Sequence, residues 1–115
     1  MPSPKISGPS NATTILTVDL DALAANYRLL LQRAAPAQCA AVVKADGYGL
    51  GVGPVGRTLH AAGCTRFFVA HLDEAATLRK ALGGAASTAE IAVLNGLMPG
   101  QEKVFRDHNL MPVLN

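Results

Sequence analysis

Short apolar runs alternate with segments of helical periodicity along this chain, at intervals of roughly 25 residues. The run at 39–45 is apolar without interruption up to its lysine, which is typical of a strand buried on both faces of a parallel sheet. The alternation therefore predicts an α/β fold with parallel strands. Four such strands form half of a TIM-type (β/α)8 barrel or most of a small doubly wound sheet.

Helix and turn signals locate the expected elements. Asp19 or Asp21 is suited to cap a first helix that ends near Arg33, where a proline follows. Asp73 is expected to cap a later helix, and Arg79 to interact favourably with the dipole at the C-terminal end of that helix. We expect helices over 20–33, 52–62, 73–82 and 101–108, and strands over 39–45, 66–70, 91–95 and 112–115.

The composition fits one small globular domain and argues against some partners. Half of the 115 residues are apolar and 16% are charged, which is not the composition of a disordered chain. The net charge is only +2, the basic residues are scattered, and aromatic residues are few, so we expect no nucleic-acid partner. No apolar run approaches the length of about 18 residues that a membrane span requires, so no membrane partner is expected either.

The N-terminus and the cysteines bear on location. Residues 1–14 are rich in Ser, Pro and Thr and lack the apolar stretch of a signal peptide, so we expect a flexible tail. Cys39 and Cys64 lack the spacing of zinc ligands. We therefore expect no metal site, and free thiols in a reducing cytoplasm.

Lys44 is the first candidate for chemistry. It directly follows a buried strand, and ligands of α/β folds bind at the carboxyl ends of the strands. A partly desolvated amine there favours the neutral, nucleophilic form that reacts with a carbonyl cofactor. Taken alone, a lysine at a strand end is more often one that extends into water.

A glycine-rich stretch follows this lysine. Tyr48 lies between Gly47 and Gly49, which allow a sharp bend that exposes the ring, and its phenol could donate to a phosphate oxygen. Residues 51–56 also form a literal GxGxxG pattern, with Asp73 downstream, as in dinucleotide-binding proteins. The pattern lies too far from the preceding strand for that fold, so a dinucleotide-binding module is the weaker alternative.

The stretch that contains Lys44 and Tyr48 resembles the pyridoxal-phosphate attachment motif of alanine racemases, AVVKANAYGHG. Here residues 41–51 read AVVKADGYGLG, with Asp46, Gly47 and Leu50 at the positions that differ. Further similar blocks lie at 17–23, 68–75, 93–96 and 112–115, so the resemblance covers roughly residues 15–115.

The resemblance implies a (β/α)8 barrel followed by a C-terminal β-domain, and a PLP-dependent enzyme that interconverts L- and D-alanine and supplies D-alanine for peptidoglycan. It implies that Lys44 binds pyridoxal 5'-phosphate covalently and acts as a catalytic base, that Tyr48 helps to fix the cofactor, and that Leu94 packs near it. It also implies a cytoplasmic homodimer whose second base, a tyrosine, comes from the C-terminal domain of the other subunit.

On this basis residues 15–115 are expected to be the first part of the barrel, with the rest of the barrel and the β-domain absent, and to be inactive by themselves. A non-catalytic PLP-binding protein and a decarboxylase on a related barrel are the alternatives, because they also place a lysine after the first strand. The Tyr-Gly turn after Lys44 favours the racemase over both.

Overall fold

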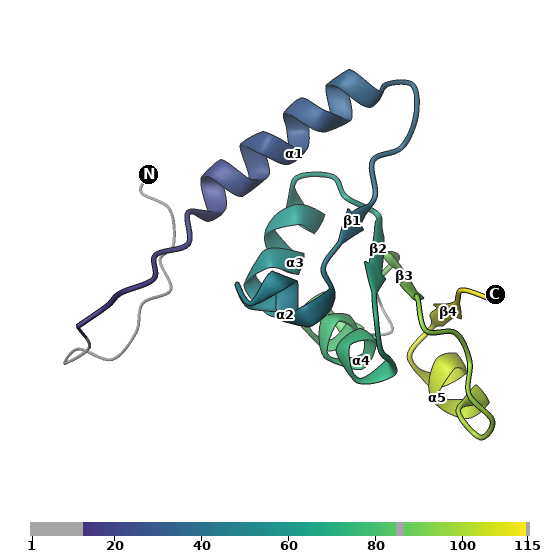
Figure 1. Cartoon of the computed structure of the whole chain (residues 1–115). Helices are drawn as coiled ribbons and strands as arrows, with labels where there is room; N and C mark the ends of the chain where they lie inside the picture. Colours follow the sequence, from purple (N-terminus) through teal and green to yellow (C-terminus); the bar gives the residue numbers. More distant parts are fainter. Residues whose placement is uncertain (1–12, 85–86, 115) are drawn as a thin grey trace.

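The computed structural model describes residues 13–84 and 87–114, which form one parallel sheet with its helices (Figure 1). The helices are α1 (Leu20–Ala34), α2 (Lys44–Tyr48), α3 (Val52–Ala61), α4 (Leu72–Ala81) and α5 (Glu102–Asp107), and the strands are β1 (Ala41–Val42), β2 (Arg66–Val69), β3 (Glu90–Val93) and β4 (Leu110–Pro112). The sheet order is β1-β2-β3-β4, and all pairs are parallel. The predicted α/β class with parallel strands is confirmed. Most of the expected tail, residues 1–12, lies outside the described residues.

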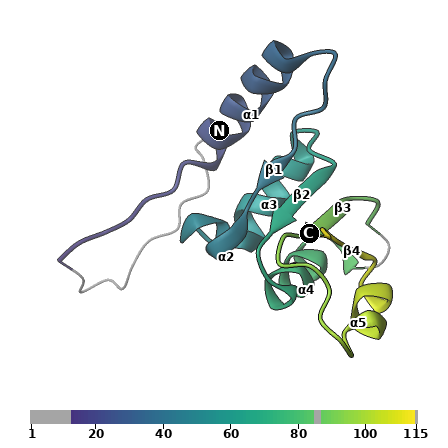
Figure 2. The same ribbon diagram turned by 45° about the vertical axis from the view of Figure 1, so that its right-hand side comes forward.

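The helices that connect the strands cover one face of the sheet. Right-handed crossovers between neighbouring parallel strands place all connecting helices on the same side. Phe67 and Val69 of β2 and Ile91 and Val93 of β3 point to this side and are essentially inaccessible. Burying each such side chain contributes about 1.5–3 kcal/mol. The core of the domain therefore lies between the sheet and α3, α4 and α5 (Figure 2).

The opposite face of the sheet has a different environment. Val42, Phe68, Ala92 and Met111 form one row across the four strands on this side. Val42 is 46% exposed and Met111 is 38% exposed. Ala92, in the middle of the row, is buried. The expectation that the first strand is buried on both faces is nevertheless wrong for this chain, because four strands do not close a barrel and Val42 is left exposed.

Helix α1 precedes the sheet and packs along α3. Asp19 is its N-cap, with Oδ1 accepting from the amide of Ala22 at 3.0 Å. The buried Tyr27 anchors the helix by donating from its hydroxyl to the carbonyl of Cys39 at 2.7 Å. Leu30, expected on the inner side, is 57% exposed, whereas its neighbour Leu31 packs against the core.

The ends of α4 differ from the expectation in two respects. Its N-cap is His71 and not Asp73, and the Glu74 side chain accepts from the His71 amide at 3.0 Å. Arg79 is buried rather than exposed at the helix end, with a relative accessibility of 1%. Its guanidinium donates to the carbonyls of His108 at 2.9 Å and Asn109 at 2.7 Å, so it links α4 to the segment before β4.

Strand β4 lies earlier in the chain than predicted. It begins at Leu110, which is buried, and it follows Asn109, whose φ of 51° reverses the chain after α5. Pairing continues as far as the amide of Val113, which donates to the carbonyl of Val93 at 3.0 Å. The strand is expected over 112–115, whereas Pro112 is its last residue in the structure; a proline is tolerated there because β4 is an edge strand.

The glycines of the GxGxxG pattern have a packing role. Gly51 precedes α3 with a φ of 96°, which favours glycine. Gly56 lies where α3 crosses α4, and a methyl group there would overlap Leu78 Cδ1. The pattern thus follows from a chain reversal and a close approach of two helices.

Candidate active site

The carboxyl ends of the strands carry the residues singled out from the sequence. The ladder extends beyond the strands themselves, since the Val43 amide donates to Phe68 at 2.9 Å and the Leu94 amide donates to Val69 at 2.8 Å. Burial alternates at the ends of β1 and β3, where Val43 and Val93 are buried and the residues that follow them are more accessible. Lys44 and Leu94 therefore lie on the same side as Val42 and Ala92, which none of the described helices covers. Two strand spacings separate them, about 10 Å in all. Lys44 is exposed and Leu94 is half-buried, so the amine is accessible next to an apolar wall.

The chain turns directly after Lys44 in a left-handed helical turn. Ala45, Asp46, Gly47 and Tyr48 have φ values of 54°, 54°, 65° and 57°. The turn is closed by hydrogen bonds from the amide of Gly47 to Val43 at 2.9 Å and from the amide of Gly49 to Ala45 at 2.8 Å. A left-handed helical conformation costs L-residues about 1–2 kcal/mol each. Strain of this kind persists only where the surrounding structure holds it, and it is common at functional sites.

This turn determines where Tyr48 lies. The tyrosine is 60% exposed at the end of the turn, as expected for a ring flanked by Gly47 and Gly49. The prediction of a sharp bend is confirmed, but the bend begins at Ala45 rather than at the first glycine. Lys44 and Tyr48 therefore belong to the same short turn.

Asp46 fixes the turn to the helix that follows. Its Oδ1 accepts from the amide of Val52 at 2.8 Å, which is the first residue of α3. The first amides of a helix have no partner within the helix, and a carboxylate satisfies one of them. This aspartate is one of the positions where the chain differs from the attachment motif.

Glu74 is a residue of this site that the sequence reasoning missed. Its Oε2 accepts from the amide of Asp46 at 3.3 Å, and its Oε1 accepts from the amides of Ala70 at 3.1 Å and His71 at 3.0 Å. Partial burial acts to raise the pKa of Glu74, but the hydrogen bonds from these amides and from Ala45 outweigh it and hold the pKa below its usual value. The carboxylate is therefore charged at neutral pH and joins the loops after β1 and β2.

A second polar contact links the next two loops. The side-chain amide of Asn95, after β3, lies 2.9 Å from Nδ1 of His71, after β2. Both side chains are exposed at the same edge of the sheet as Lys44. Capping-box logic at a glutamate three residues into a helix could have identified Glu74, whereas no local signal identifies the pair of Asn95 and His71.

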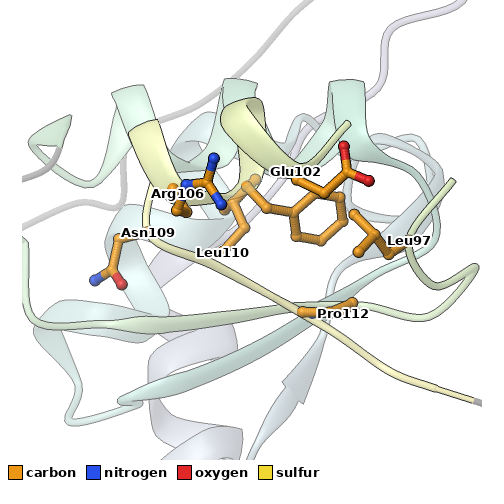
Figure 3. Close-up of a pocket in the computed structure, with 7 residues that line it drawn as sticks. Leu97, Glu102, Arg106, Asn109, Leu110 and Pro112 are labelled. Carbon is orange, nitrogen blue, oxygen red and sulfur yellow. The ribbon is translucent and has the colours of Figure 1, made fainter. Parts of the chain in front are cut away.

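A cavity of about 450 Å³ lies between α5 and β4, with Glu102 and Arg106 on one side and Pro112 on the other (Figure 3). None of Lys44, Tyr48 and Leu94 lines it.

In the part of the chain that the structure describes, no helix has the length and apolarity needed to cross a membrane.

Comparison with known proteins gives consistent matches. A family model described as the N-terminal domain of alanine racemase matches residues 18–115. An alanine racemase of Methylobacterium sp. (strain 4-46) is 54% identical over 99 residues, which is 86% of this chain and 26% of that protein. A catabolic alanine racemase of Rhizobium johnstonii is 52% identical over 104 residues, which is 90% of this chain and 27% of that protein.

Solved structures agree with the sequence matches. The crystal structure of alanine racemase from Bartonella henselae with covalently bound pyridoxal phosphate has a TM-score of 0.78 and 42% identity, over 85% of this chain and 28% of that one. Alanine racemase from E. faecalis has a TM-score of 0.71 and 31% identity, over 81% of this chain and 24% of that one. The chain thus spans about a quarter of the length of these relatives, and its four strands correspond to the first part of their barrel. Residues 18–115 therefore belong to the alanine racemase family, as its N-terminal domain.

Proposed function

We propose that this chain contributes the cofactor lysine and the first β/α units of a PLP-dependent alanine racemase, which interconverts L- and D-alanine. The observation that carries the proposal is the position of Lys44, an exposed amine at the carboxyl end of the first strand. A structure of the same fold, the racemase of Bartonella henselae, is described with covalently bound pyridoxal phosphate.

The residues present suit this cofactor. Lys44 supplies a primary amine, which is the group that forms a covalent bond to an aldehyde. Tyr48 supplies an exposed phenol in the same turn, which would donate to a phosphate oxygen. Leu94 supplies apolar surface on the same row as Lys44, against which the cofactor would pack. These three residues are the ones we assign to cofactor binding.

The chemistry divides between the cofactor and the chain. When bound, pyridoxal phosphate acts as a sink for the electron pair left at Cα when a proton is removed. Lys44 Nζ, once released by the incoming amino acid, would move this proton on one face of the substrate. Tyr48 and Leu94 would hold the ring so that Cα stays within reach of that amine. The base for the opposite face is proposed to be a tyrosine of a C-terminal domain in the second subunit of a homodimer.

The test uses a complete protein, because the chain matches about a quarter of each relative. Residues 1–115 replace the matching N-terminal part of the Methylobacterium racemase; we call this fusion the completed racemase. Borohydride reduction followed by peptide mapping should find the cofactor on Lys44. Lys44→Ala should lower the racemisation rate by about 100-fold or more, because anchor and base are lost together. A label on Lys80 or Lys103, or near-normal turnover of Lys44→Ala, would refute the assignment.

A second test addresses Tyr48. Tyr48→Phe removes one hydroxyl and keeps the ring, so cofactor affinity should fall by about 1.5–3 kcal/mol if the hydroxyl donates to a charged phosphate. Equilibrium dialysis measures this loss directly. Unchanged retention would place Tyr48 outside the phosphate site.

The physiological role is testable in cells. We propose a cytoplasmic enzyme that supplies D-alanine for peptidoglycan, and the completed racemase should support growth of a bacterial strain that requires D-alanine. The Lys44→Ala variant serves as the matched control. Failure of the active enzyme to support growth would refute the proposed supply of D-alanine.

A further inference from the structure

The backbone at the Lys44 site adopts a strained conformation that its own hydrogen bonds only partly stabilise. Ala45, Asp46 and Tyr48 are non-glycine residues with φ between 54° and 57°, so the turn carries a conformational penalty at several adjacent positions. Hydrogen bonds within the turn involve the amides of Gly47 and Gly49. The amide of Asp46, near the start of the turn, instead donates out of the turn to Glu74. The start of the turn is therefore held by a residue from another element.

Glu74 is suited to this role because it is itself held in place. It lies in the first turn of α4, where its Oε1 accepts two amides from the loop that connects β2 to this helix. Its second oxygen remains for Asp46 at 3.3 Å. A single carboxylate thus joins the carboxyl ends of the neighbouring strands β1 and β2, and Lys44 directly precedes the left-handed turn.

We propose that Glu74 is a positioning residue for the cofactor lysine: its carboxylate holds the left-handed turn against the β2–α4 loop and so sets the placement of Lys44 and Tyr48. The inference deepens the proposed function and rests on it. Glu74 would act through the backbone and not by touching the cofactor. A carboxylate is required because it accepts on both oxygens, whereas a glutamine offers one acceptor oxygen and an NH₂ group that would face an amide.

The test compares Glu74→Gln with Glu90→Gln in the completed racemase. Both changes remove one negative charge from a side chain of the same size. Glu90 begins β3 at the opposite end of the sheet, where it forms an exposed ion pair with Arg66 at 2.6 Å. It therefore controls for the loss of charge and of one surface interaction without reaching the Lys44 site.

The first measurement needs no cofactor. Amide hydrogen exchange is followed at Asp46, Ala70 and His71 in the cofactor-free protein. We expect exchange at Asp46 to become about tenfold faster in Glu74→Gln and to stay unchanged in Glu90→Gln, because exchange follows local opening. Equal exchange in the two variants would show that Glu74 does not hold the turn, and it would overturn the proposal.

The second measurement is the cofactor concentration at which half of Lys44 is trapped by borohydride. We expect it to rise about tenfold in Glu74→Gln, in the range found for residues that orient a ligating side chain. Unfolding midpoints of both variants are recorded, and trapping is measured well below them. A lower midpoint for Glu74→Gln with unchanged half-saturation would show a purely structural role and overturn the proposal.

The two proposals fail in different ways. If the unsubstituted completed racemase acquires no cofactor on Lys44, the proposed function is refuted, and the exchange experiment still decides whether Glu74 holds the turn. If cofactor is trapped on Lys44 in every variant with equal half-saturation, the proposed function stands and the positioning role of Glu74 is refuted.

Discussion

Tyr27 shows how one buried polar group couples stability to pH. Burial raises its pKa to about 12, with a further contribution from the nearby Cys64. The unfolded chain would ionise this phenol from about pH 10, whereas the folded chain keeps it neutral to about pH 12. The stabilisation is therefore complete below pH 10 and is lost as the pH rises toward 12.

Tyr27→Phe should lower the free energy of unfolding of the completed racemase by about 0.5–1.5 kcal/mol at pH 8, because the hydrogen bond to Cys39 is lost. It should also reduce the fall in stability between pH 10 and 12. Denaturant unfolding at pH 8, 10 and 11.5 measures both effects. An equally steep alkaline fall in the variant would assign that fall to other groups, such as the buried Cys64 thiol, whose pKa burial also raises.

The sequence was informative about the residues at the site but not about their backbone. An apolar run that ends in a lysine pointed to Lys44, the flanking glycines pointed to Tyr48, and the family resemblance added Leu94. The left-handed conformation of Ala45 and Asp46 could not be predicted from the sequence, because neither residue has an intrinsic preference that requires it. It depends on a hydrogen bond to Glu74, which lies 28 positions away along the chain.

Among the contacts between elements, the Arg79 side chain connects α4 to the segments that precede β3 and β4. Its guanidinium reaches the carbonyls of Ser87 at 3.4 Å, His108 at 2.9 Å and Asn109 at 2.7 Å. These carbonyls belong to the segments that lead into β3 and β4. One side chain of α4 therefore helps to position the last two strands.

Arg79→Ala should destabilise the completed racemase by at least about 3 kcal/mol, since it removes the hydrogen bonds of a buried guanidinium to three carbonyls, and a hydrogen bond with one charged partner contributes about 1.5–3 kcal/mol. Lys80→Ala, at the exposed neighbouring position, should stay within about 0.5 kcal/mol of the parent. Chemical denaturation of the two variants gives the comparison. Equal stabilities would mean that the guanidinium is dispensable.

The expected helices over 20–33, 52–62, 73–82 and 101–108 agree with α1, α3, α4 and α5 within one residue at each end. The first and last strands agree less well, since β1 covers only Ala41–Val42 of the expected 39–45 and β4 begins two residues before the expected start. The helix over 73–82 was expected from Asp73, but the structure begins it at Leu72 with His71 as the cap. An aspartate is a common N-cap residue, so the sequence pointed to Asp73. In the structure the capping carboxylate is that of Glu74, three residues after the N-cap His71. Strand β4 is expected to start at Pro112, but in the structure it starts at the buried Leu110, which the partly exposed Met111 follows.

In the molecule as a whole, helices cover one face of the sheet, whereas the other face is open and leaves apolar side chains partly exposed. Val42 and Met111 are partly exposed on the open face, in a row with Phe68 and Ala92. Both outer strands also have an unpaired edge in the described residues. Apolar patches much larger than about 600 Å² are rarely left bare on soluble monomers. The apolar alternation of the sequence could predict the strands, but not which face would remain open.

The 115-residue chain on its own should therefore associate at micromolar concentration and should not racemise alanine. Met111→Glu, on the open face, should reduce association, because burying a charge there is unfavourable. Val104→Glu, a similarly exposed apolar position on α5, is the matched control. Sedimentation velocity measures association, and a chiral assay with added cofactor measures activity. A monomeric chain that racemises alanine would contradict both expectations.

The handedness of the turn after Lys44 also limits which sequences can occupy it. At Ala45, with a φ of 54°, glycine and asparagine enter the left-handed region at little cost, whereas valine, isoleucine and threonine are strongly disfavoured by their branched Cβ. If all residues are tested at position 45, the stability of the variants should follow the preference of each residue for the left-handed backbone region, rather than the size or polarity of its side chain. Ala45→Gly should raise stability and Ala45→Val should lower it, although the side chain is exposed and meets little. The conformation of the main chain, rather than side-chain contacts, therefore determines which residues can follow the proposed cofactor lysine.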